Sequence, residues 1–341
     1  MANLRTSFLA VVQLVLVSPF AGAQLRTGYY ASICPNLETI IRSSVKQSMA
    51  QSQISGPAAL RLFFHDCAVR VHIHAEPFLP MHAPSTDLLT QLYYMVVQGC
   101  DASIMLVNPN GDDEWHNPDD QSLKQQGFQT ILDAKTAVDS DPQCRYKVSC
   151  ADILALAARE SVAQSGGPNY QVELGRYDGR VSTKSSVVLP HVDFNLDKLN
   201  AFFSTLGLSQ TDMIALSGGH TLGAADCTFF QSRIGTDTTM DSGFAAQLQG
   251  TCAGQSAAFL DGVTPSGFDN SYYKNLQAGR GLLGSDQVLY TDQRSRGTVN
   301  YYASNQATFF YDFANAMTKL GRVGVKTAAN GEIRRDCRYT N

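Results

Sequence analysis

The sequence predicts a mainly helical, globular protein. It has 341 residues, of which 44% are hydrophobic and 16% are charged, a composition typical of one large domain or two fused lobes with a sizeable core. Apolar residues recur at helical spacing along much of the chain, whereas strand signals are confined to residues 172–174 and a hairpin near Gly331. The sequence contains no internal repeats or low-complexity tracts. We therefore expect many helices and only minor β structure.

The expected helices begin soon after the N-terminal segment. The first covers residues 37–50, and Gly56 and Pro57 open the second, which carries ALRLFFHDC at residues 59–67. A capping-box pattern marks the start of two more, Ser149 with Asp152 for residues 150–163 and Ser209 with Asp212 for a short helix ending at Leu216. The other periodic segments are 128–138, 194–206, 224–233, 244–249, 270–278, 294–303 and 306–320.

The N-terminal segment is typical of a secretory signal peptide. Residues 1–23 contain one early cation, Arg5, then the apolar run 8–20 and a small-residue ending at Ala23. This pattern predicts export and a mature domain of residues 24–341. No later stretch of the sequence has the length and apolar character of a membrane span, so no membrane partner is expected. The formal net charge of -4 gives no electrostatic case for nucleic acid.

The cysteines indicate an oxidising compartment. There are 8, an even number, and none occurs in a Cys-x-x-Cys motif. In an exported chain this usage predicts disulfides rather than a thiolate metal site. Spacing alone leaves their pairing open.

Arg61 and His65 form the first candidate catalytic pair. Their spacing of four places both side chains on one face of a helix, one turn apart. An imidazole can take and return a proton near neutral pH, and a guanidinium can stabilise developing negative charge. The alternative is a surface arginine and a core histidine on an amphipathic helix. The apolar neighbours Leu60 and 62–64 predict that the pair is buried, and buried polar groups need polar partners.

His220 is the second candidate. It follows a helix end and two glycines, Gly218 and Gly219, which let the backbone approach another group closely. A single histidine at a helix terminus is commonly a cap. The alternative is a metal ligand.

Taken together, these features resemble the secretory plant haem peroxidases, the class III or horseradish peroxidase type. The stretches RLFFHDC and ALSGGHTLG carry the resemblance, and it extends over nearly the whole mature chain. It implies a two-lobed, mainly helical haem peroxidase fold with minor β hairpins and one haem b between the lobes. Further segments that follow the family pattern are YYASICPN, GCDASI, VSCADILALAAR, GGPNYQVELGRYDGR, FDNSYYKNL, GLLGSDQ and GEIRRDC.

The resemblance also implies roles for individual residues. His220 looks like the proximal imidazole that binds the haem iron, and Asp286 resembles the carboxylate that accepts a hydrogen bond from its other ring nitrogen. On the opposite face, His65 would take a proton from hydrogen peroxide and return it to the departing oxygen. Arg61 would stabilise the charge separation.

Three further positions bear on the distal side. Phe64 looks like the aromatic residue that keeps substrates away from the iron, so that electrons leave through the exposed haem edge. Pro190 resembles the proline of the aromatic-donor site, although a proline after a loop leucine is also an ordinary turn residue. Asp120 stands where relatives often have an asparagine that orients the distal histidine. A carboxylate there should hold the ring N–H more firmly and raise the pKa of His65.

Two calcium sites and four disulfides also come with the resemblance. Calcium prefers carboxylate, hydroxyl and carbonyl oxygens, and the alternative for Asp and Ser in such loops is Asx-turn chemistry. The matching positions are Asp66, Val69, Gly99, Asp101 and Ser103 for the distal ion, and Thr221, Asp261, Thr264, Gly267 and Asp269 for the proximal ion. The family's disulfides would pair Cys34 with Cys144, Cys67 with Cys100, Cys150 with Cys337, and Cys227 with Cys252.

Residues 71–98 depart from the family pattern, in which HDC is followed almost at once by GCDAS. This insertion separates Cys67 from Cys100, but a longer loop adds little closure cost, so the disulfide can form if the insertion loops out. We hypothesise a retained intron, because Val71 has a codon beginning with GT and Gln98 can be CAG. On this hypothesis the histidines of the insertion, His72, His74 and His82, form no metal site. Transcripts that carry the segment at high abundance would refute it.

The expected function is therefore that of a secreted haem peroxidase. It would reduce hydrogen peroxide while oxidising small phenolic donors by one-electron steps, as a monomer in the extracellular space or cell wall rather than the vacuole. The alternative is a secreted haem-binding protein whose turnover is impaired by the insertion. A disulfide-stapled binding module without haem is a more distant alternative.

Overall fold

Helices dominate the part of the chain that the computed structural model describes, residues 25–72, 95–97 and 99–341. The predicted signal peptide, residues 1–23, lies outside these residues. None of the described helices has the length and apolar character needed to span a membrane. The mainly helical prediction is confirmed.

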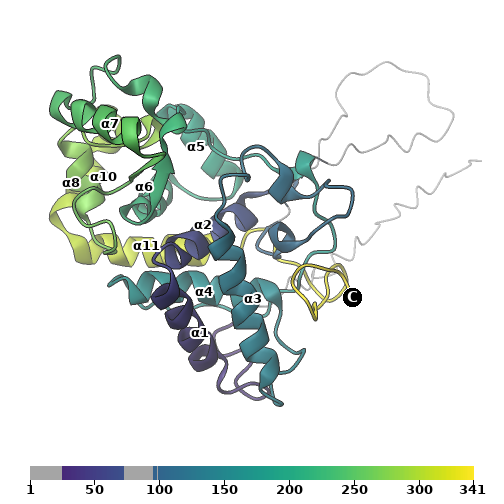
Figure 1. The fold of residues 1–341 in the computed structure, drawn as a ribbon. Coiled ribbons are helices and arrows are strands. Elements are labelled where there is room, and N and C mark those ends of the chain that lie inside the picture. The colour runs from purple at the N-terminus through teal and green to yellow at the C-terminus, as the bar shows by residue number, and fades with distance from the viewer. Residues whose placement is uncertain (1–24, 73–94, 98) are drawn as a thin grey trace, which may run out of the picture.

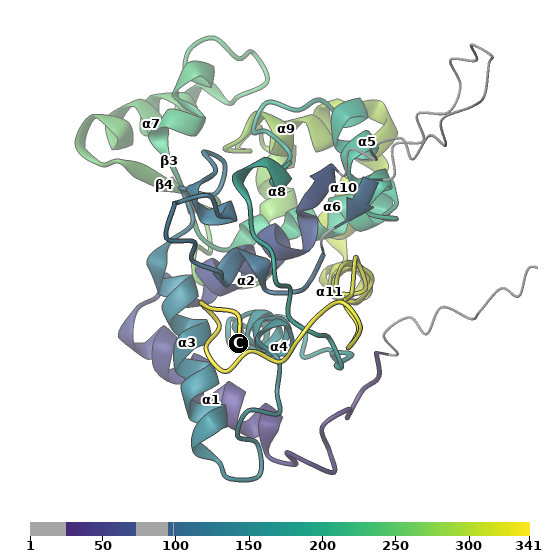
Figure 2. The same cartoon turned by 90° about the vertical axis from the view of Figure 1, so that its right-hand side faces the viewer.

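The helices form two groups with α2 between them (Figures 1 and 2). The N-terminal group packs four helices against one another: α1 (Leu37–Gln51), α2 (Ser55–Ala68), α3 (Gln125–Ser140) and α4 (Cys150–Gln164). The second group is built from α5 (Leu196–Thr205), α6 (Gln210–Ser217), α8 (Ser271–Gln277), α9 (Gly284–Thr291), α10 (Gln293–Ser304) and α11 (Gln306–Leu320).

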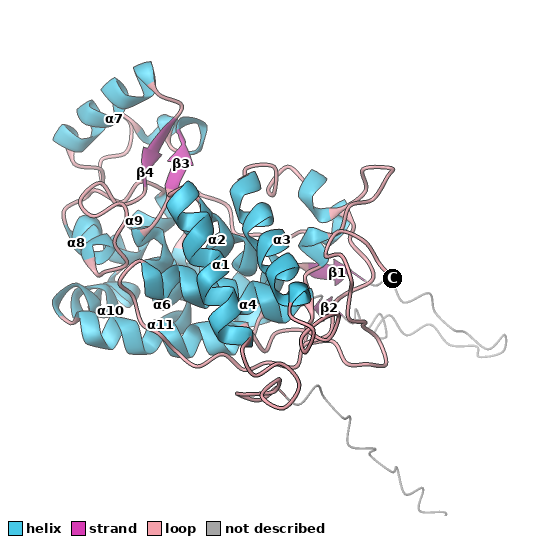
Figure 3. Cartoon of the chain, turned by 60° about the horizontal axis from the view of Figure 1, so that its bottom comes forward, coloured by secondary structure: helices cyan, strands magenta, loops and turns pink. Residues whose placement is uncertain are grey.

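Short elements connect and cover these helices. One antiparallel sheet pairs β1 (Arg70–His72) with β2 (Met95–Val97), and a second pairs β3 (Ala224–Asp226) with β4 (Ala257–Phe259), next to α7 (Ser242–Gly254) (Figure 3). The 3-10 helices are η1 (Ser103–Met105), η2 (Glu114–His116), η3 (Lys184–Ser186), η4 (Gly218–Thr221), η5 (Cys227–Phe229) and η6 (Gln231–Arg233).

The core follows from the apolar pattern of the helices. In α4 every residue from Cys150 to Val162 is buried, as expected for a helix that is covered on all sides. α2 is buried along most of its length, including the fully buried Leu62 and Cys67. Because α2 packs against α3 and α4, and its Phe64 ring centroid lies 6.0 Å from that of Phe203 in α5, the side chains that α2 carries are held in fixed positions.

The two predicted capping boxes turn out differently. At the start of α6 the box is complete: Asp212 N–H donates to the Ser209 hydroxyl at 3.2 Å, and Ser209 N–H donates to the Asp212 carboxylate at 2.9 Å. At the start of α4 only the first half forms. The carboxylate of Asp152 instead accepts hydrogen bonds from Tyr30, Gly175 and Arg176, so this part of the prediction is wrong.

Three other predictions need correction. Residues 224–233, expected to be helical, form β3 followed by η5 and η6, because β3 pairs with the distant β4. The strand signal at residues 172–174 gives a single bridge, Arg26 with Leu174, and the hairpin near Gly331 is two bridges, Tyr177 with Lys326 and Asp178 with Glu332. α9 was not predicted.

The ends of the insertion lie side by side. β1 and β2 pair antiparallel with Arg70 opposite Val97, so the chain returns to the point it left and the Cys67–Cys100 disulfide forms. The other three disulfides also pair as the resemblance implied. His74 and His82 lie outside the described residues, and the intron hypothesis stays a prediction.

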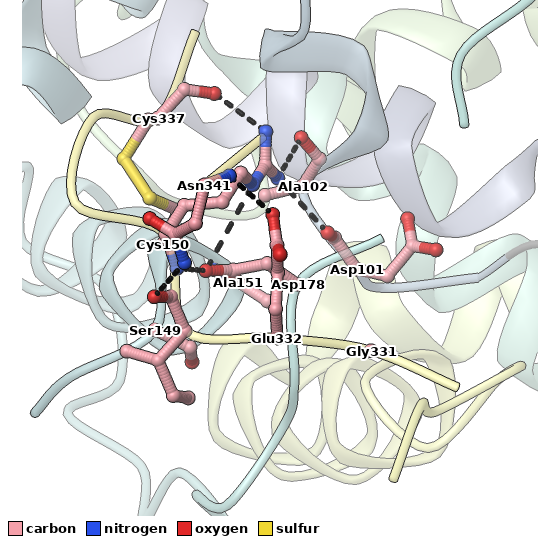
Figure 4. A network of polar contacts seen from close by, with 12 residues as sticks. Asp101, Ala102, Ser149, Cys150, Ala151, Asp178, Gly331, Glu332, Cys337 and Asn341 are labelled. Carbon is pink, nitrogen blue, oxygen red and sulfur yellow. Dashed lines mark hydrogen bonds and ion pairs between the residues drawn. A yellow bond between two sulfur atoms is a disulfide. The ribbon is translucent and has the colours of Figure 1, made fainter. Parts of the chain in front are cut away.

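The C-terminal segment meets the loop that follows the insertion in a network of polar contacts around Asp178 and Asp101 (Figure 4). Arg334 is fully buried, and its guanidinium donates to the carbonyl oxygen of Ala102 at 2.6 Å while its backbone N–H donates to Asp178 Oδ2 at 2.8 Å. The other oxygen of Asp178 accepts from Ala151 N–H at 2.9 Å, in the first turn of α4. Arg334 therefore ties three distant segments together.

Replacement of Arg334 should strongly destabilise the fold. Arg334 Nε also lies 3.9 Å from Asp178 Oδ2, so in Arg334→Met the carboxylate stays buried without its cation, and breaking such a pair costs about 3–5 kcal/mol. The exposed neighbour in Arg335→Met provides the control, with an expected loss below about 1 kcal/mol. Urea unfolding of both variants measures the free energies. Equal losses would contradict the role given to Arg334.

Candidate active site

Helix α2 places the distal pair. Arg61 Nε donates a hydrogen bond to His65 Nε2 at 3.1 Å, so the two side chains meet on one helix face as their spacing predicts. His65 is buried, but Arg61 is exposed, and the expectation that apolar neighbours bury both is wrong for Arg61. An arginine that is open to solvent on one side of a buried histidine can reach a molecule entering the site.

Asp120 fixes the tautomer of His65. Its Oδ1 lies 2.5 Å from His65 Nδ1, and the carboxylate is fully buried. Because Nε2 accepts from Arg61, the ring proton is on Nδ1 and points at Asp120. The geometry leaves His65 neutral, with Nε2 as the proton-accepting atom.

The surroundings keep His65 unprotonated. Burial lowers the pKa of His65, and the charge of Arg61 lowers it further, while the hydrogen bond to Asp120 and its negative charge raise it. The sum is a pKa below the ordinary value. Asp120 thus raises the pKa of His65, as predicted, although burial outweighs the carboxylate in the total.

Ser122 anchors Arg61, and sequence reasoning missed it. The guanidinium donates to the Ser122 hydroxyl at 2.8 Å and to its carbonyl oxygen at 3.3 Å. Ser122 lies two residues after Asp120 in the loop before α3, so one loop orients both distal side chains. Its closeness to Asp120 in the sequence was the only available signal.

On the proximal side, η4 presents His220 directly after α6. A Cβ at Gly218 would collide with Tyr273 and Phe309, so this position has room only for glycine. His220 Nδ1 lies 2.8 Å from Asp286 Oδ1, the hydrogen bond that the resemblance implied. The side chain of His220 is 41% exposed, and Nε2 takes part in no hydrogen bond among the described residues.

The distal and proximal histidines come from elements that lie close together, α2 and η4. Burial lowers the pKa of His220, but the charge of Asp286 and the hydrogen bond to it more than compensate, so the pKa is raised. The charge of Arg61 also acts on His220, and lowers its pKa. Next to His220, a side chain at Gly219 would come within 3.8 Å of Leu60, the neighbour of Arg61. α2 and η4 are therefore close neighbours.

Tyr272 is a further proximal residue that sequence reasoning did not assign. Its hydroxyl donates to Asp286 Oδ1 at 2.8 Å, the same oxygen that His220 contacts. Tyr272 is buried in α8. Its segment FDNSYYKNL was noted as a motif, but the sequence offers no sign of which tyrosine turns toward Asp286.

The distal calcium positions form a buried acidic cluster. Asp101 Oδ2 and Ser103 Oγ are buried without a hydrogen-bond partner. Burial, and then the charge of Asp101, raise the pKa of Asp66 well above its ordinary value. Among the described residues, no three His, Cys, Asp or Glu side chains are arranged to hold a metal ion, so a cation here would also need the carbonyl groups of Val69 and Gly99.

The proximal calcium positions also converge. Asp261 is fully buried, and its Oδ2 accepts from the hydroxyls of Thr221 at 3.3 Å and Thr264 at 3.2 Å. Thr221 also lies 3.3 Å from the carbonyl oxygen of Gly267, and a Cβ at Gly267 would be 3.8 Å from Asp269 Oδ2. Thr221 follows His220 directly, which links this cluster to the proximal histidine.

The two predicted donor-site residues are placed as follows. Phe64 is half-buried, with its ring centroid 6.1 Å from that of His65 and 6.0 Å from that of Phe203. Pro190 is half-buried in the segment between η3 and α5. Contact between Pro190 and the distal pair stays a prediction.

The helical fold and the two imidazoles, each hydrogen-bonded to a buried carboxylate, agree with the haem peroxidase class that the sequence resembles. A model of the family described as peroxidase matches residues 41–305. Similar proteins from Arabidopsis thaliana include Peroxidase 45, 49% identical over 99% of this chain and 98% of its own length, and Peroxidase 16, 48% identical over 100% of both. Peroxidase 50 is 44% identical over 98% of both chains. The chain belongs to the peroxidase family, in the secretory plant class.

Asp120→Asn should move the acid limb of the pH-rate profile. His65 must be neutral to accept a proton, so activity is lost as the pH falls through its pKa. The negative charge of Asp120 raises that pKa, and its removal should therefore shift the limb to lower pH, by about one unit. The shift is measured from steady-state rates between about pH 3 and about pH 8, a range that extends on both sides of the reference pKa of histidine. An unchanged limb would count against Asp120.

Proposed function

We propose that this peroxidase reduces hydrogen peroxide to water and takes electrons one at a time from small phenolic donors. The observation that carries the proposal is the pair of carboxylate-held imidazoles, His65 beside Arg61 and His220 on Asp286. Peroxidases act on hydrogen peroxide and a reductant. The phenolic class of the reductant rests on the resemblance.

The proximal residues fit a haem. His220 has a solvent-accessible side chain, Nδ1 fixed by a buried carboxylate, and Nε2 left for an iron ion. The carboxylate gives the imidazole anionic character and makes it a stronger ligand. When bound there, haem b would supply an iron centre that takes two oxidising equivalents from peroxide and passes them on singly.

The distal residues supply the proton chemistry. His65 Nε2 would take the proton from one oxygen of hydrogen peroxide and return it to the other oxygen, which leaves as water. Arg61, held by Ser122, would stabilise the negative charge that develops during O–O cleavage. Asp120 keeps the imidazole in the accepting tautomer. Phe64 and Pro190 would border the route of the donor.

The structure favours turnover over passive haem binding. The rival function assumed that the insertion disrupts the distal side. Instead β1 pairs with β2, the Cys67–Cys100 disulfide forms, and His65 keeps both of its partners. This is the arrangement that a proton-transfer site requires.

Two calcium ions and export complete the proposal. Asp101 Oδ2 and Ser103 Oγ are buried without a hydrogen-bond partner, which supports the distal ion, and Lys326 Nζ lies 3.6 Å from Asp101 Oδ2. The hydrogen bonds of Thr221 and Thr264 to Asp261, with the carbonyl oxygen of Gly267 next to Thr221, support the proximal ion. Asp66, Val69, Gly99 and Asp269 would complete the two ligand sets. Residues 1–23, as a signal peptide, would deliver the protein to the extracellular space.

The function is tested with the purified full chain loaded with haem. A Soret band that shifts on addition of hydrogen peroxide and returns on addition of guaiacol is the expected result. A Soret band that does not respond to peroxide would support the haem-binding alternative. A protein without a Soret band would refute both and revive the binding module without haem.

Metal analysis tests the calcium sites. The wild-type protein should hold two calcium ions, and Asp101→Ala and Asp261→Ala should each lose one, while the exposed control Asp193→Ala keeps both. Calcium that binds only the folded state stabilises it by about 2.7 kcal/mol per site at a hundredfold excess over Kd. Chelation should therefore lower the melting temperature of the wild type most. Equal metal content in all variants would contradict the assignment.

A further inference from the structure

We propose that Tyr272 tunes how strongly His220 donates electrons to the haem iron, by sharing the carboxylate oxygen of Asp286. The proposal rests on the proposed function, in which His220 binds the iron. It adds a positioning residue that acts through Asp286 rather than on the substrate.

One carboxylate oxygen of Asp286 accepts hydrogen bonds from two donors. Asp286, in the first turn of α9, is 3% exposed, and its Oδ1 lies 2.8 Å from His220 Nδ1 and 2.8 Å from the hydroxyl oxygen of Tyr272. Tyr272 comes from α8, so three separate elements meet at this oxygen. Asp286 and Tyr272 are both buried, so the hydrogen bond between them lies in a low-dielectric environment, where it is stronger than in water.

The two hydrogen bonds oppose each other in their effect on the imidazole. A hydrogen bond from Tyr272 draws negative charge away from Oδ1, so this oxygen accepts less strongly from His220. A weaker bond to His220 leaves the imidazole less anionic, and a less anionic ligand stabilises oxidised iron less. With Tyr272 present, the Fe(III)/Fe(II) reduction potential is therefore higher than it would be if Asp286 contacted His220 alone.

Tyr272 is held in place as a neutral donor. Burial, followed by the charge of Asp286, raises the pKa of Tyr272 well above its ordinary value, so the phenol keeps its proton. Its ring packs edge-on against Tyr273 with centroids 5.0 Å apart, and lies 6.2 Å from the ring of His220. The packing around Tyr272 thus keeps its hydroxyl next to Asp286.

Tyr273 offers a matched control. It follows Tyr272 in the same helix and is equally buried, but its hydroxyl donates to the carbonyl oxygen of Ile214 at 2.9 Å. Tyr273→Phe removes the same atom from the same helix without touching Asp286.

The test is the Fe(III)/Fe(II) equilibrium of the haem-loaded protein, with the iron–histidine stretching frequency as a second readout. Tyr272→Phe should shift the equilibrium toward the oxidised iron by about three- to tenfold, the worth of one hydrogen bond, and raise the stretching frequency. Tyr273→Phe should change neither. A packing defect alone would affect both variants alike.

A second substitution reverses the sign. Replacing Tyr272 by 3-fluorotyrosine keeps the ring and makes the phenol a stronger donor, so the equilibrium should shift toward reduced iron. If Tyr272→Phe does not fold, the 3-fluorotyrosine variant tests the proposal by itself. Unchanged values in both Tyr272 variants of an active, haem-containing protein would overturn this inference alone, and a wild-type protein without haem would overturn it together with the proposed function.

Discussion

The site depends on one interaction that occurs twice: a buried carboxylate accepts a hydrogen bond from a histidine ring. Asp120 holds Nδ1 of His65 and Asp286 holds Nδ1 of His220, so in both rings Nε2 is the atom left for chemistry. The consequences differ because the surroundings differ. Burial and the charge of Arg61 outweigh Asp120 and lower the pKa of His65, whereas Asp286 outweighs desolvation and raises the pKa of His220. In the proposed function, the same interaction serves a proton acceptor on one side and a metal ligand on the other.

The fold keeps both pairs in place by enclosing the elements that carry them. α2 packs mainly against α3 and α4, and the loop before α3 supplies both Asp120 and Ser122. The end of α2 is closed by the Cys67–Cys100 disulfide, and Arg334 ties the next residues, at Ala102, to the C-terminal segment. The insertion leaves and returns through the paired strands β1 and β2, so its length does not loosen the distal side.

Much of this could be predicted from the sequence because it is local. The helical spacing of apolar residues predicted α1, α4 and α11, and the separation of four residues between Arg61 and His65 predicted their contact. What failed depends on residues far apart in the chain. β3 forms because it pairs with β4, and Asp152 leaves its capping box because Tyr30 and Arg176 bind it. Tyr272 could not be assigned because its meeting with Asp286 depends on how α8 packs on α9.

The account is tested most directly by the second-order rate constant for the reaction of hydrogen peroxide with the haem-loaded protein. It is compared between the wild type and His65→Ala. We expect the rate constant to fall by about 10²- to 10⁴-fold while haem binding is kept, because the proposed function assigns proton transfer to His65 and iron binding to His220. An unchanged rate constant, or the loss of haem from His65→Ala, would contradict this division of roles between the two histidines.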